Sequence, residues 1–383
     1  MRGHIRRRGK DSWAIVIDRG RDANGKCCQK WHTVRGTKKH AQRELAAMLH
    51  QMDTGSYVEP NKLTVCHYLD VWLRLTQTKV SAKTFERYDE IVRQHLIPAL
   101  GHHLLNRLQP LHIETYYLNA QTIGRRDGNG GLSAQTVLHH HRVLHNALRH
   151  AVQLLLLARN PADAVQPPRP LRPHVRTVDE EQSAVLLRAL AGSRLHGPTL
   201  LELATGLRRG ELLALTWANV DFDKALITVC QSLQQTNGGV SIKEPKSGRG
   251  RQLALPTFAV EALRAHRARQ AEERLLLGPG YVDNDLVFPR YDGSFWAPDS
   301  FTSSFAAAVR KSGLMDVNFH ALRHSHATIL LKQGVNPKVV SERLGHAKVG
   351  TTLDIYSHVL PSMQEQAAQG LDRAFRRAMI MTK

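Results

Sequence analysis

Four short segments in the C-terminal half of the chain contain residue types that bind anions and transfer protons. Residues 204–217 include an arginine, residues 243–251 are rich in lysine and arginine, residues 320–324 hold a histidine and an arginine, and residues 344–356 hold a histidine and a tyrosine. Guanidinium groups bind phosphate oxygens in bidentate pairs, and an activated tyrosine oxygen is a nucleophile. Together the four segments could form one site for phosphate chemistry.

Each segment by itself has an ordinary structural explanation. Arg208 could be a surface arginine after a helix break, and the basic turn around Lys246 could simply be solvated. His320 and Arg323, three residues apart, would share one helix face and could pair with a carboxylate. Tyr356 could be a core residue. The functional interpretation therefore rests on the ordered set.

That set resembles the active site of the tyrosine recombinases, the phage-integrase family. The family pattern is an arginine in a T-G-L-R-x-x-E segment, a lysine in a hairpin, an H-x-x-R pair, and an L-G-H segment followed by a tyrosine ten residues after its histidine. The chain contains every member in this order and with this last spacing. The matching residues are Arg208, Lys246, His320, Arg323, His346 and Tyr356.

The resemblance implies a DNA-breaking and DNA-joining enzyme that works through a 3′-phosphotyrosyl intermediate. Tyr356 would attack a phosphodiester, and Arg208 and Arg323 would bind the two non-bridging oxygens of the transition state. The guanidinium groups would supply the charge that magnesium supplies in other phosphoryl-transfer sites. No metal, ATP or other cofactor is therefore expected.

The same resemblance assigns the proton transfers. Lys246 would protonate the leaving 5′ oxygen, and His320 would help to activate the tyrosine, whose usual pKa of about 10 makes it a weak nucleophile at neutral pH. His346 would donate a hydrogen bond to a non-bridging oxygen. Lys243 is an alternative to Lys246, although the K-S-G turn favours Lys246. Glu211 either orients the first arginine or is only a solvated helix residue.

Local signals predict how these residues are presented. Gly206 would let the chain leave a helix just before the first arginine. Asn336-Pro337 is an N-cap and first-turn pair that opens a helix, and Gly345 would end that helix before the histidine of L-G-H. Thr351 would start the short helix that carries the tyrosine. His324 is expected to be structural, and His326 is expected to be a core or a surface histidine.

The whole chain divides into three predicted domains, and the fold class is mainly α with small β-sheets (α+β). Residues 1–60 resemble an arm-type DNA-binding module, residues 63–160 a helical, SAM-like core-binding domain, and residues 175–383 the catalytic domain. A proline-rich linker at 161–174 joins the last two. The resemblance thus extends over nearly the whole chain.

Hydrophobic periodicity predicts the elements of each domain. The first module would have strands at 13–17 and 27–34 around Asn24-Gly25, and a helix capped by Thr37. Four helix starts are expected in the second domain, at Thr64, Ser81, Pro110 and Ser133. In the third domain a capping box at 177–180 would open a helix, and strands at 225–229, 240–242 and 252–255 would form a small sheet with a turn at Gly238-Gly239.

Histidines cluster in the helical domain, at 139–141, 145 and 150. His141 and His145, four residues apart, suggest a metal site at first sight. However, consecutive histidines point around a helix, no carboxylate has matching spacing, and Arg142 and Arg149 disfavour a cation. A metal site is therefore not expected here.

Composition supports a polyanionic partner. The 383 residues carry 53 Lys and Arg against 33 Asp and Glu, a formal net charge of +20, and no apolar run is long enough to cross a membrane. Such a surplus favours nucleic acid. Four cysteines without zinc spacing suggest a reduced, cytoplasmic chain that lies on the bacterial nucleoid.

The resemblance predicts an integrase that integrates and excises a phage or another mobile element. Its partners would be double-stranded DNA with core and arm-type sites, three further copies in a homotetramer, and possible accessory factors, namely a host DNA-bending protein and an excisionase. The amphipathic segment at 361–383 would dock on a neighbouring copy or pack in cis. Alternatives are an Xer-type chromosome-dimer resolvase, an inactive DNA-binding regulator of the same fold, and a metal-dependent nuclease.

Overall fold

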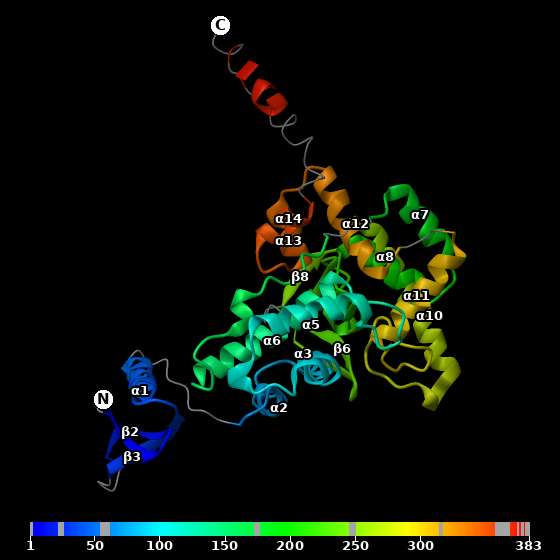
Figure 1. Ribbon diagram of the computed structural model, residues 1–383. Coiled ribbons are helices and arrows are strands. Elements are labelled where there is room, and N and C mark those ends of the chain that lie inside the picture. The colour runs from blue at the N-terminus through cyan, green and yellow to red at the C-terminus, as the bar shows by residue number, and fades with distance from the viewer. Residues whose placement is uncertain are drawn as a thin grey trace. The chain divides into compact units, whose positions relative to one another are not determined.

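The chain forms two compact units, one up to Leu171 and one from Thr177 onward (Figure 1). A computed structural model describes residues 3–21, 27–53, 62–171, 177–244, 250–313, 317–356, 368–373, 375–376 and 379. Helices dominate, and the sheets are small and antiparallel. This architecture confirms the predicted fold class.

The first unit begins with a three-stranded antiparallel sheet in the order β1-β2-β3. Its strands are β1 (Gly3–Gly9), β2 (Ser12–Arg21) and β3 (Cys27–Arg35). Strand β1 was not predicted, because its arginines resemble a basic tail; it forms as an edge strand paired with β2. Asn24-Gly25 lies outside the described residues.

One helix, α1 (Lys38–Asp53), follows this sheet. The Thr37 hydroxyl accepts a hydrogen bond from the backbone N–H of His40 at 3.3 Å, as its predicted capping role requires. Four successive β2 residues from Ala14 to Ile17 are buried, and so is Ala41 of α1. Whether this sheet and helix form a separate domain stays a prediction, since residues 54–61 are outside the described part.

Residues 62–171 are mainly helical. The helices are α2 (Val65–Thr76), α3 (Ala82–Ile91), α4 (Ile97–Leu100), α5 (Pro110–Ile123) and α6 (Ala134–Gln153), with a π-helical segment at Val92–Leu96 and short 3₁₀ turns at Leu105–Arg107 and Pro161–Ala164.

The four predicted helix starts in this region are confirmed. Thr64, Ser81 and Ser133 each accept a hydrogen bond from the backbone N–H of the third helical residue, and Pro110 is the first residue of α5. The apolar faces of these helices meet in one buried core that includes Trp72. Capping side chains and periodicity therefore fixed these boundaries locally.

Three histidines of α6 contact side chains outside this helix. The Tyr116 hydroxyl lies 2.7 Å from Nδ1 of His140, the Tyr117 hydroxyl lies 2.8 Å from Nδ1 of His141, and Nε2 of His145 lies 2.8 Å from Asp163. Burial lowers the pKa of His140 to about 4. These rings thus help to join α6 to α5 and to the Pro161–Ala164 turn.

The second unit contains two small sheets, where the sequence predicted one. Strands β4 (Val220–Asp221), β5 (Leu226–Val229) and β8 (Arg251–Ala254) form the first, and β6 (Ser232–Thr236) and β7 (Gly239–Lys243) form the second. The predicted strand at 240–242 therefore pairs with β6, which was not predicted, and not with β5. Polar residues in β6 concealed it from the periodicity analysis.

The second unit also contains the helices α7 (Glu180–Ala189), α8 (His196–Thr205), α9 (Arg209–Leu213), α10 (Thr257–Leu277), α11 (Pro298–Lys311), α12 (Phe319–Lys332), α13 (Pro337–Leu344) and α14 (Val349–Tyr356). The capping box of α7 differs from the prediction. Asp179 caps the helix and exchanges hydrogen bonds with Gln182, so the box is at 179–182 and not at 177–180.

Helices α8 and α12 lie side by side in the second unit, as Figure 1 shows in green and orange. Phe301, Phe305 and Phe319 are fully buried and meet edge to face, which ties α11 to the start of α12. Helix α13 packs on α12 and α14, and it also contacts β8. These contacts bring Arg208, Arg323 and His346 together at the end of α13.

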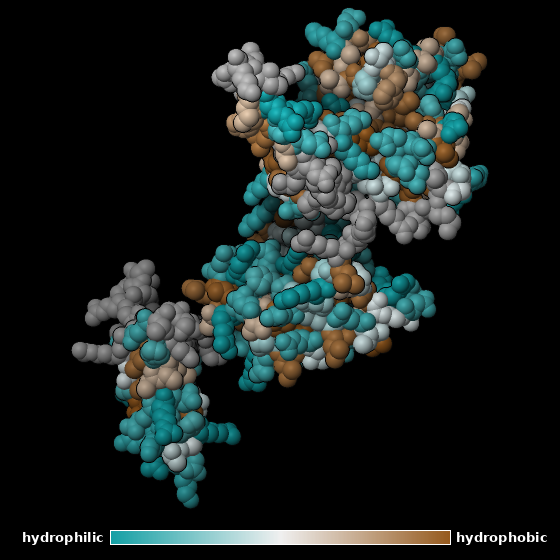
Figure 2. Space-filling model, turned by 90° about the horizontal axis from the view of Figure 1, so that it is seen from above, coloured by the Kyte–Doolittle hydropathy of each residue, from teal (hydrophilic) through white to brown (hydrophobic). Residues whose placement is uncertain are grey.

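The face drawn in Figure 2 is largely hydrophilic over the sheet module at its lower left. Arg6, Arg7 and Arg8 of β1 are exposed. In the described part of the chain, no helix is both long enough and apolar enough to span a bilayer.

Candidate active site

A glycine corner presents the first predicted catalytic arginine. Gly206 ends α8 in the left-handed conformation, with φ 64° and ψ 31°, as the sequence predicted. A Cβ at this position would lie 2.7 Å from Cδ2 of His326 and 2.8 Å from Cδ2 of Leu344. Both the backbone angles and the lack of space therefore require glycine. The chain then turns so that Arg208 precedes α9 in an extended conformation.

Arg208 and Glu211 hold each other in place. Nη1 of Arg208 donates to Oε1 of Glu211 at 2.8 Å, and the backbone N–H of Arg208 donates to Oε2 at 3.0 Å. Nη2 of Arg208 donates to the carbonyl oxygen of Gly345 at 2.7 Å. About a third of the arginine side chain stays exposed, 34%, against 2% of the glutamate. Glu211 is thus buried and bonded to Arg208, and it is not a solvated helix residue; its role in orienting the arginine stays a prediction.

A second arginine, Arg251 of β8, also binds Glu211. Its Nη1 and Nη2 donate to the two carboxylate oxygens at 3.0 and 2.7 Å, in a bidentate pair. Burial alone would raise the pKa of Glu211, but the hydrogen bonds and charges of Arg251 and Arg208 outweigh burial and lower this pKa to about 2. Glu211 is therefore a buried anion between two cations.

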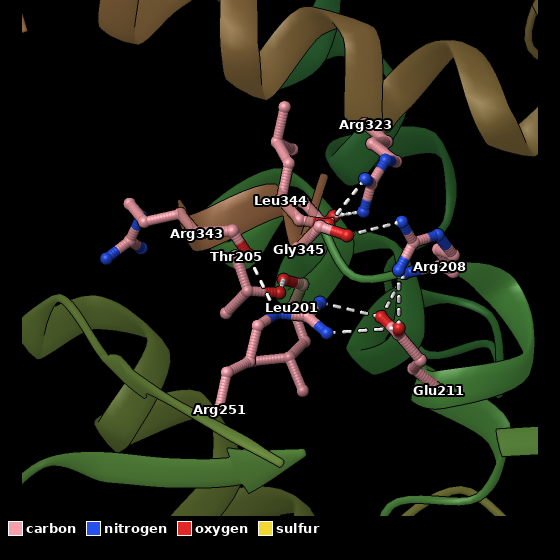
Figure 3. A network of polar contacts seen from close by, with 10 residues as sticks. Leu201, Thr205, Arg208, Glu211, Arg251, Arg323, Arg343, Leu344 and Gly345 are labelled. Carbon is pink, nitrogen blue, oxygen red and sulfur yellow. Dashed lines mark hydrogen bonds and ion pairs between the residues drawn. The ribbon is translucent and has the colours of Figure 1, made fainter. Parts of the chain in front are cut away.

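Arg323, the second predicted phosphate ligand, lies on the buried side of α12. Its Nη1 donates to the carbonyl oxygen of Gly206, and its Nη2 donates to that of Leu344 at 2.6 Å. Burial and the nearby charge of Arg208 lower its pKa to about 10, so the guanidinium stays charged at neutral pH. The side chain bridges the glycine corner and the end of α13 (Figure 3).

Two histidines of α12 lie one turn apart near these arginines. The rings of His320 and His324 meet edge to face at 4.7 Å. Burial, followed by the charges of Arg323, Arg208 and Arg209, lowers the pKa of His320. Because a lowered pKa keeps the imidazole neutral at neutral pH, His320 can accept a proton there.

His326, also on α12, contacts helix α8. Its Nδ1 lies 2.8 Å from the carbonyl oxygen of Leu203 in α8, and the residue is buried. Burial lowers its pKa to about 4. His326 is therefore a core histidine, one of the two alternatives that the sequence left open.

His346 directly follows the left-handed cap of α13. Gly345 has φ 64° and ψ 44°, and the backbone N–H of His346 donates to the carbonyl oxygen of Ser341. Nδ1 of His346 lies 2.8 Å from the hydroxyl of Thr352, which is fully buried in α14. Burial and the charges of Arg323, Arg208 and Arg251 lower the pKa of His346 to about 4.

The remaining predicted residues are placed only in part. Lys246 lies outside the described residues, and Lys243 is the last residue of β7. Tyr356 is the last residue of α14, and its side chain is outside what the structure describes. This helix begins at Val349, two residues before the predicted start at Thr351.

Sequence reasoning missed Arg251, Thr352 and Glu202. Arg251 appeared to belong to a solvated basic turn, and a threonine in a short helix carries no signal of its own. Glu202 is fully buried on α8, and neither of its carboxyl oxygens has a hydrogen-bond partner among the described residues. Burial raises its pKa well above the usual value. The only signal for Glu202 in the sequence was a charged residue within the apolar stretch of α8.

The described site is thus a cationic cluster built from several elements. Arg208, Arg323 and His346 converge at the end of α13, with His320 on the adjacent helix. Such a cluster can bind an anion with two negative oxygens, such as a phosphodiester, and can take up a proton. Among the described residues, no group of three His, Cys, Asp or Glu side chains could hold a metal ion.

Two family models match the chain. The phage integrase family model matches residues 176–363, and the model of the phage integrase N-terminal SAM-like domain matches residues 64–120. The first match contains all the predicted catalytic residues, and the second covers most of the region from α2 to α5.

Curated relatives extend the similarity to nearly the whole chain. A tyrosine recombinase XerC-like protein from Caldanaerobacter subterraneus subsp. tengcongensis is 28% identical over 96% of this chain and 97% of its own length. An integrase from Streptomyces ambofaciens is 27% identical over 96% of this chain and 95% of its own. The tyrosine recombinase XerD of Mycobacterium leprae is 31% identical over 61% of this chain and 74% of its own.

Solved structures share the fold. The integrase of transposon Tn1549 in complex with transposon right end DNA aligns with a TM-score of 0.68 and 22% identity, over 81% of this chain and all of that one. A lambda integrase tetramer bound to a Holliday junction aligns with a TM-score of 0.57 and 17% identity, over 90% of this chain and 95% of that one. At these identities the likeness concerns the fold.

Proposed function

From the premise that this chain belongs to the phage integrase family and is a tyrosine recombinase, we propose that it recombines DNA at specific sites through a 3′-phosphotyrosyl intermediate, and that it does so to integrate and excise a mobile element. One observation carries the proposal for the site. Arg208, Arg323 and His346 come from three separate segments, and they converge at the end of α13.

In the proposed cleavage step, the Tyr356 oxygen forms a bond to phosphorus while the bond from phosphorus to the 5′ oxygen breaks. The tyrosine proton passes to His320, and Lys246 gives a proton to the leaving oxygen. The lowered pKa of His320 supports this role, because the ring is neutral before the reaction. Each proton transfer would contribute about 10²–10⁴-fold in rate.

Arg208 and Arg323 would bind the non-bridging oxygens. An arginine has five N–H donors, so a guanidinium that donates to carbonyl groups can still donate to a phosphate. Arg323 is buried and Arg208 is 34% exposed, and charges shielded from water stabilise a developing negative charge more than they would in water. If the Thr352 hydroxyl donates to Nδ1 of His346, the imidazole keeps its hydrogen on Nε2 and can donate it to the phosphate.

Rejoining would reverse these transfers. The phosphotyrosyl bond retains the energy of the original phosphodiester, so a 5′ hydroxyl from another strand can attack it without ATP. Recombination then requires two DNA sites and four copies of the chain. The lambda integrase tetramer on a Holliday junction, which shares this fold, supports such an assembly by analogy. We also propose that the reaction takes place in the cytoplasm. An accessory DNA-bending protein and an excisionase would take part in it.

The first module would bind DNA apart from the exchange site. Its β1 strand has exposed arginines, and Arg6 lies over the ring of Trp31, so its cationic side chains are available to phosphates. An Xer-type resolvase is the second candidate, favoured by the XerC-like relative. Resolvases of that type usually consist of the last two domains only, so the sheet of β1 to β3 favours the integrase.

The decisive experiment uses a nicked duplex that carries the attachment site, identified from the DNA junctions that flank the gene. The nick lets the 5′ end diffuse away, so cleavage should trap a protein–DNA adduct that resists denaturation. We expect an adduct from the wild type and from Tyr291→Phe, an exposed tyrosine of the same unit, and none from Tyr356→Phe. No wild-type adduct on this site would favour a DNA-binding regulator, and cleavage that a chelator stops would favour a metal-dependent nuclease.

A further inference from the structure

Three consecutive carbonyl groups at the end of α13 each accept a hydrogen bond from a different arginine (Figure 3). Nε of Arg251 donates to the carbonyl oxygen of Arg343 at 3.0 Å. The next two carbonyl oxygens accept from Arg323 at 2.6 Å and from Arg208 at 2.7 Å. The three arginines come from β8, α12 and the start of α9, so one helix end collects side chains from three elements.

Helix chemistry explains why cations gather here. The last carbonyl groups of a helix lack intrahelical donors, and they carry the negative end of the helix dipole. Gly345 keeps this end open: a Cβ there would lie 2.9 Å from Nη1 and 3.0 Å from Cζ of Arg251. The Arg343 side chain, by contrast, points away from the cluster, and it donates to the carbonyl oxygens of Ala204 and Ala254.

Arg251 differs from the other two arginines in how its donors are used. All three of its nitrogens donate within the protein, one to a carbonyl of α13 and two to Glu211, and its side chain is only 13% exposed. Arg208 is 34% exposed. The side-chain nitrogens of Arg251 are therefore all used within the protein, whereas Arg208 can also bind a ligand.

The groups that Arg251 holds are those that place the catalytic side chains. Glu211 fixes both the backbone and the guanidinium of Arg208. The end of α13 leads within two residues from Leu344 to His346, whose ring then bonds to α14. Because both connections are short, a shift of Arg251 moves the phosphate-binding cluster relative to α14.

We propose that Arg251 is a positioning residue of the recombination reaction, which locks Glu211 to the end of α13 so that Arg208, Arg323 and His346 converge on one phosphate. The proposal rests on the proposed function. Arg251 does not touch the DNA phosphate in this role; it acts through Glu211 and the α13 carbonyl groups. A lysine at this position keeps the charge but cannot reproduce the three-donor fork.

The test compares Arg251→Lys with Arg274→Lys in the full chain, on the nicked site described above. Arg274 forms an exposed ion pair with Asp283 at 2.7 Å, so its substitution controls for loss of an arginine fork elsewhere in the same unit. At saturating DNA we expect R251K to reduce the single-turnover cleavage rate by about 10–100-fold, because misplacement by about 1 Å costs on that order. The Kd of R251K for the site should stay near that of the wild type. The cleavage rate and the Kd of R274K should also stay near wild-type values.

A double-mutant cycle with Glu211→Gln gives the second readout. If Arg251 acts through Glu211, adding R251K to E211Q should reduce the cleavage rate much less than R251K does alone. Wild-type cleavage by R251K, equal losses in cleavage and in DNA binding, additive effects in the cycle, or failure of R251K to fold would each overturn the positioning role. Absence of a wild-type adduct, or an adduct from Y356F, would instead count against the proposed function.

Discussion

At the scale of single residues, the site is organised by groups that do not react. Glu211 is a buried anion that joins Arg208 to Arg251, and Thr352 is a buried hydroxyl that bonds to His346. Each of them fixes the orientation of a side chain that the family resemblance assigns to the phosphate. Substitutions of these partners therefore separate positioning from chemistry.

The pair Thr352 and Thr351 offers a matched test of His346. Thr352 is buried and bonds to the imidazole, whereas the adjacent Thr351 is exposed. We expect Thr352→Val to slow cleavage about tenfold, the effect of losing one hydrogen bond of ~1.4 kcal/mol, and Thr351→Val to cleave normally. Single-turnover adduct formation measures both. Equal rates for the two valine variants would contradict the orienting role of Thr352.

Glu202 should make the stability of the second unit depend on pH. Because burial raises its pKa, the folded state holds this proton more tightly than the unfolded state does. The associated stability is complete below a pH of about 4.5, the usual value for the unfolded chain, and is lost as the pH rises toward the raised pKa. Glu202→Gln mimics the protonated form, so it should gain stability relative to wild type as the pH rises.

Urea unfolding at about pH 5 and about pH 8 measures this difference. The exposed Glu272 supplies the control, since Glu272→Gln removes a carboxylate that stays in water. A constant stability difference between E202Q and wild type across this range would show that Glu202 is ionised in the folded state.

At the scale of elements, glycine corners and helix ends decide where the catalytic segments meet. Gly206 and Gly345 both end helices in the left-handed conformation, and each is followed within two residues by a predicted catalytic residue. The same two glycines allow close approach of other elements, as the short distances to a Cβ show. Turn chemistry and packing therefore act together at these corners.

A comparison of two glycines of the second unit distinguishes the cost of a left-handed backbone from the cost of steric crowding. Gly206 and Gly192 both have positive φ, at 64° and 75°, but only Gly206 has atoms within 3 Å of a Cβ. We expect Gly192→Ala to cost about 1 kcal/mol for the backbone alone, and Gly206→Ala about 2–4 kcal/mol because packing must also shift. Urea unfolding of the full chain, with the transition of this unit assigned by limited proteolysis, measures both. Similar losses would mean that His326 and Leu344 move aside freely.

At the scale of the whole molecule, the net charge of +20 matters for how the chain finds DNA. Only a few of the cations belong to the site around α13, and exposed arginines of β1 add to the surplus elsewhere. Most of the charge is therefore expected to follow the DNA backbone without regard to sequence.

This view predicts a steep dependence of DNA binding on salt. If six to ten phosphates are contacted, affinity for a duplex should fall by ~10³-fold or more between about 50 and 200 mM salt. Replacing Arg6 and Arg8 of β1 by alanine should reduce the slope of log Kd against log salt by about 1–2 on DNA that contains arm-type sites. Fluorescence anisotropy over a salt series measures both values. A change in affinity of less than tenfold for the wild type would contradict backbone-dominated binding.

The sequence by itself determined the family, the fold class and several helix starts, because these depend on local signals. The side chains of Thr64, Ser81 and Ser133 cap the helices that follow them, so these helix starts can be predicted locally. The spacing from His346 to Tyr356 can be read from the sequence alone. Strands β1 and β6 escaped prediction, since pairing with a neighbour stabilises them more than their own polar sequences do.

Only the tertiary structure decided which residues support the site. Arg251 and Glu211 lie forty positions apart, and nothing in either segment indicates that they form a bidentate pair. Arg251, Arg323 and Arg208 meet because three elements pack against one helix end, whose unpaired carbonyl groups attract cations from any direction. Such convergence depends on packing over long sequence separations, which local patterns do not encode.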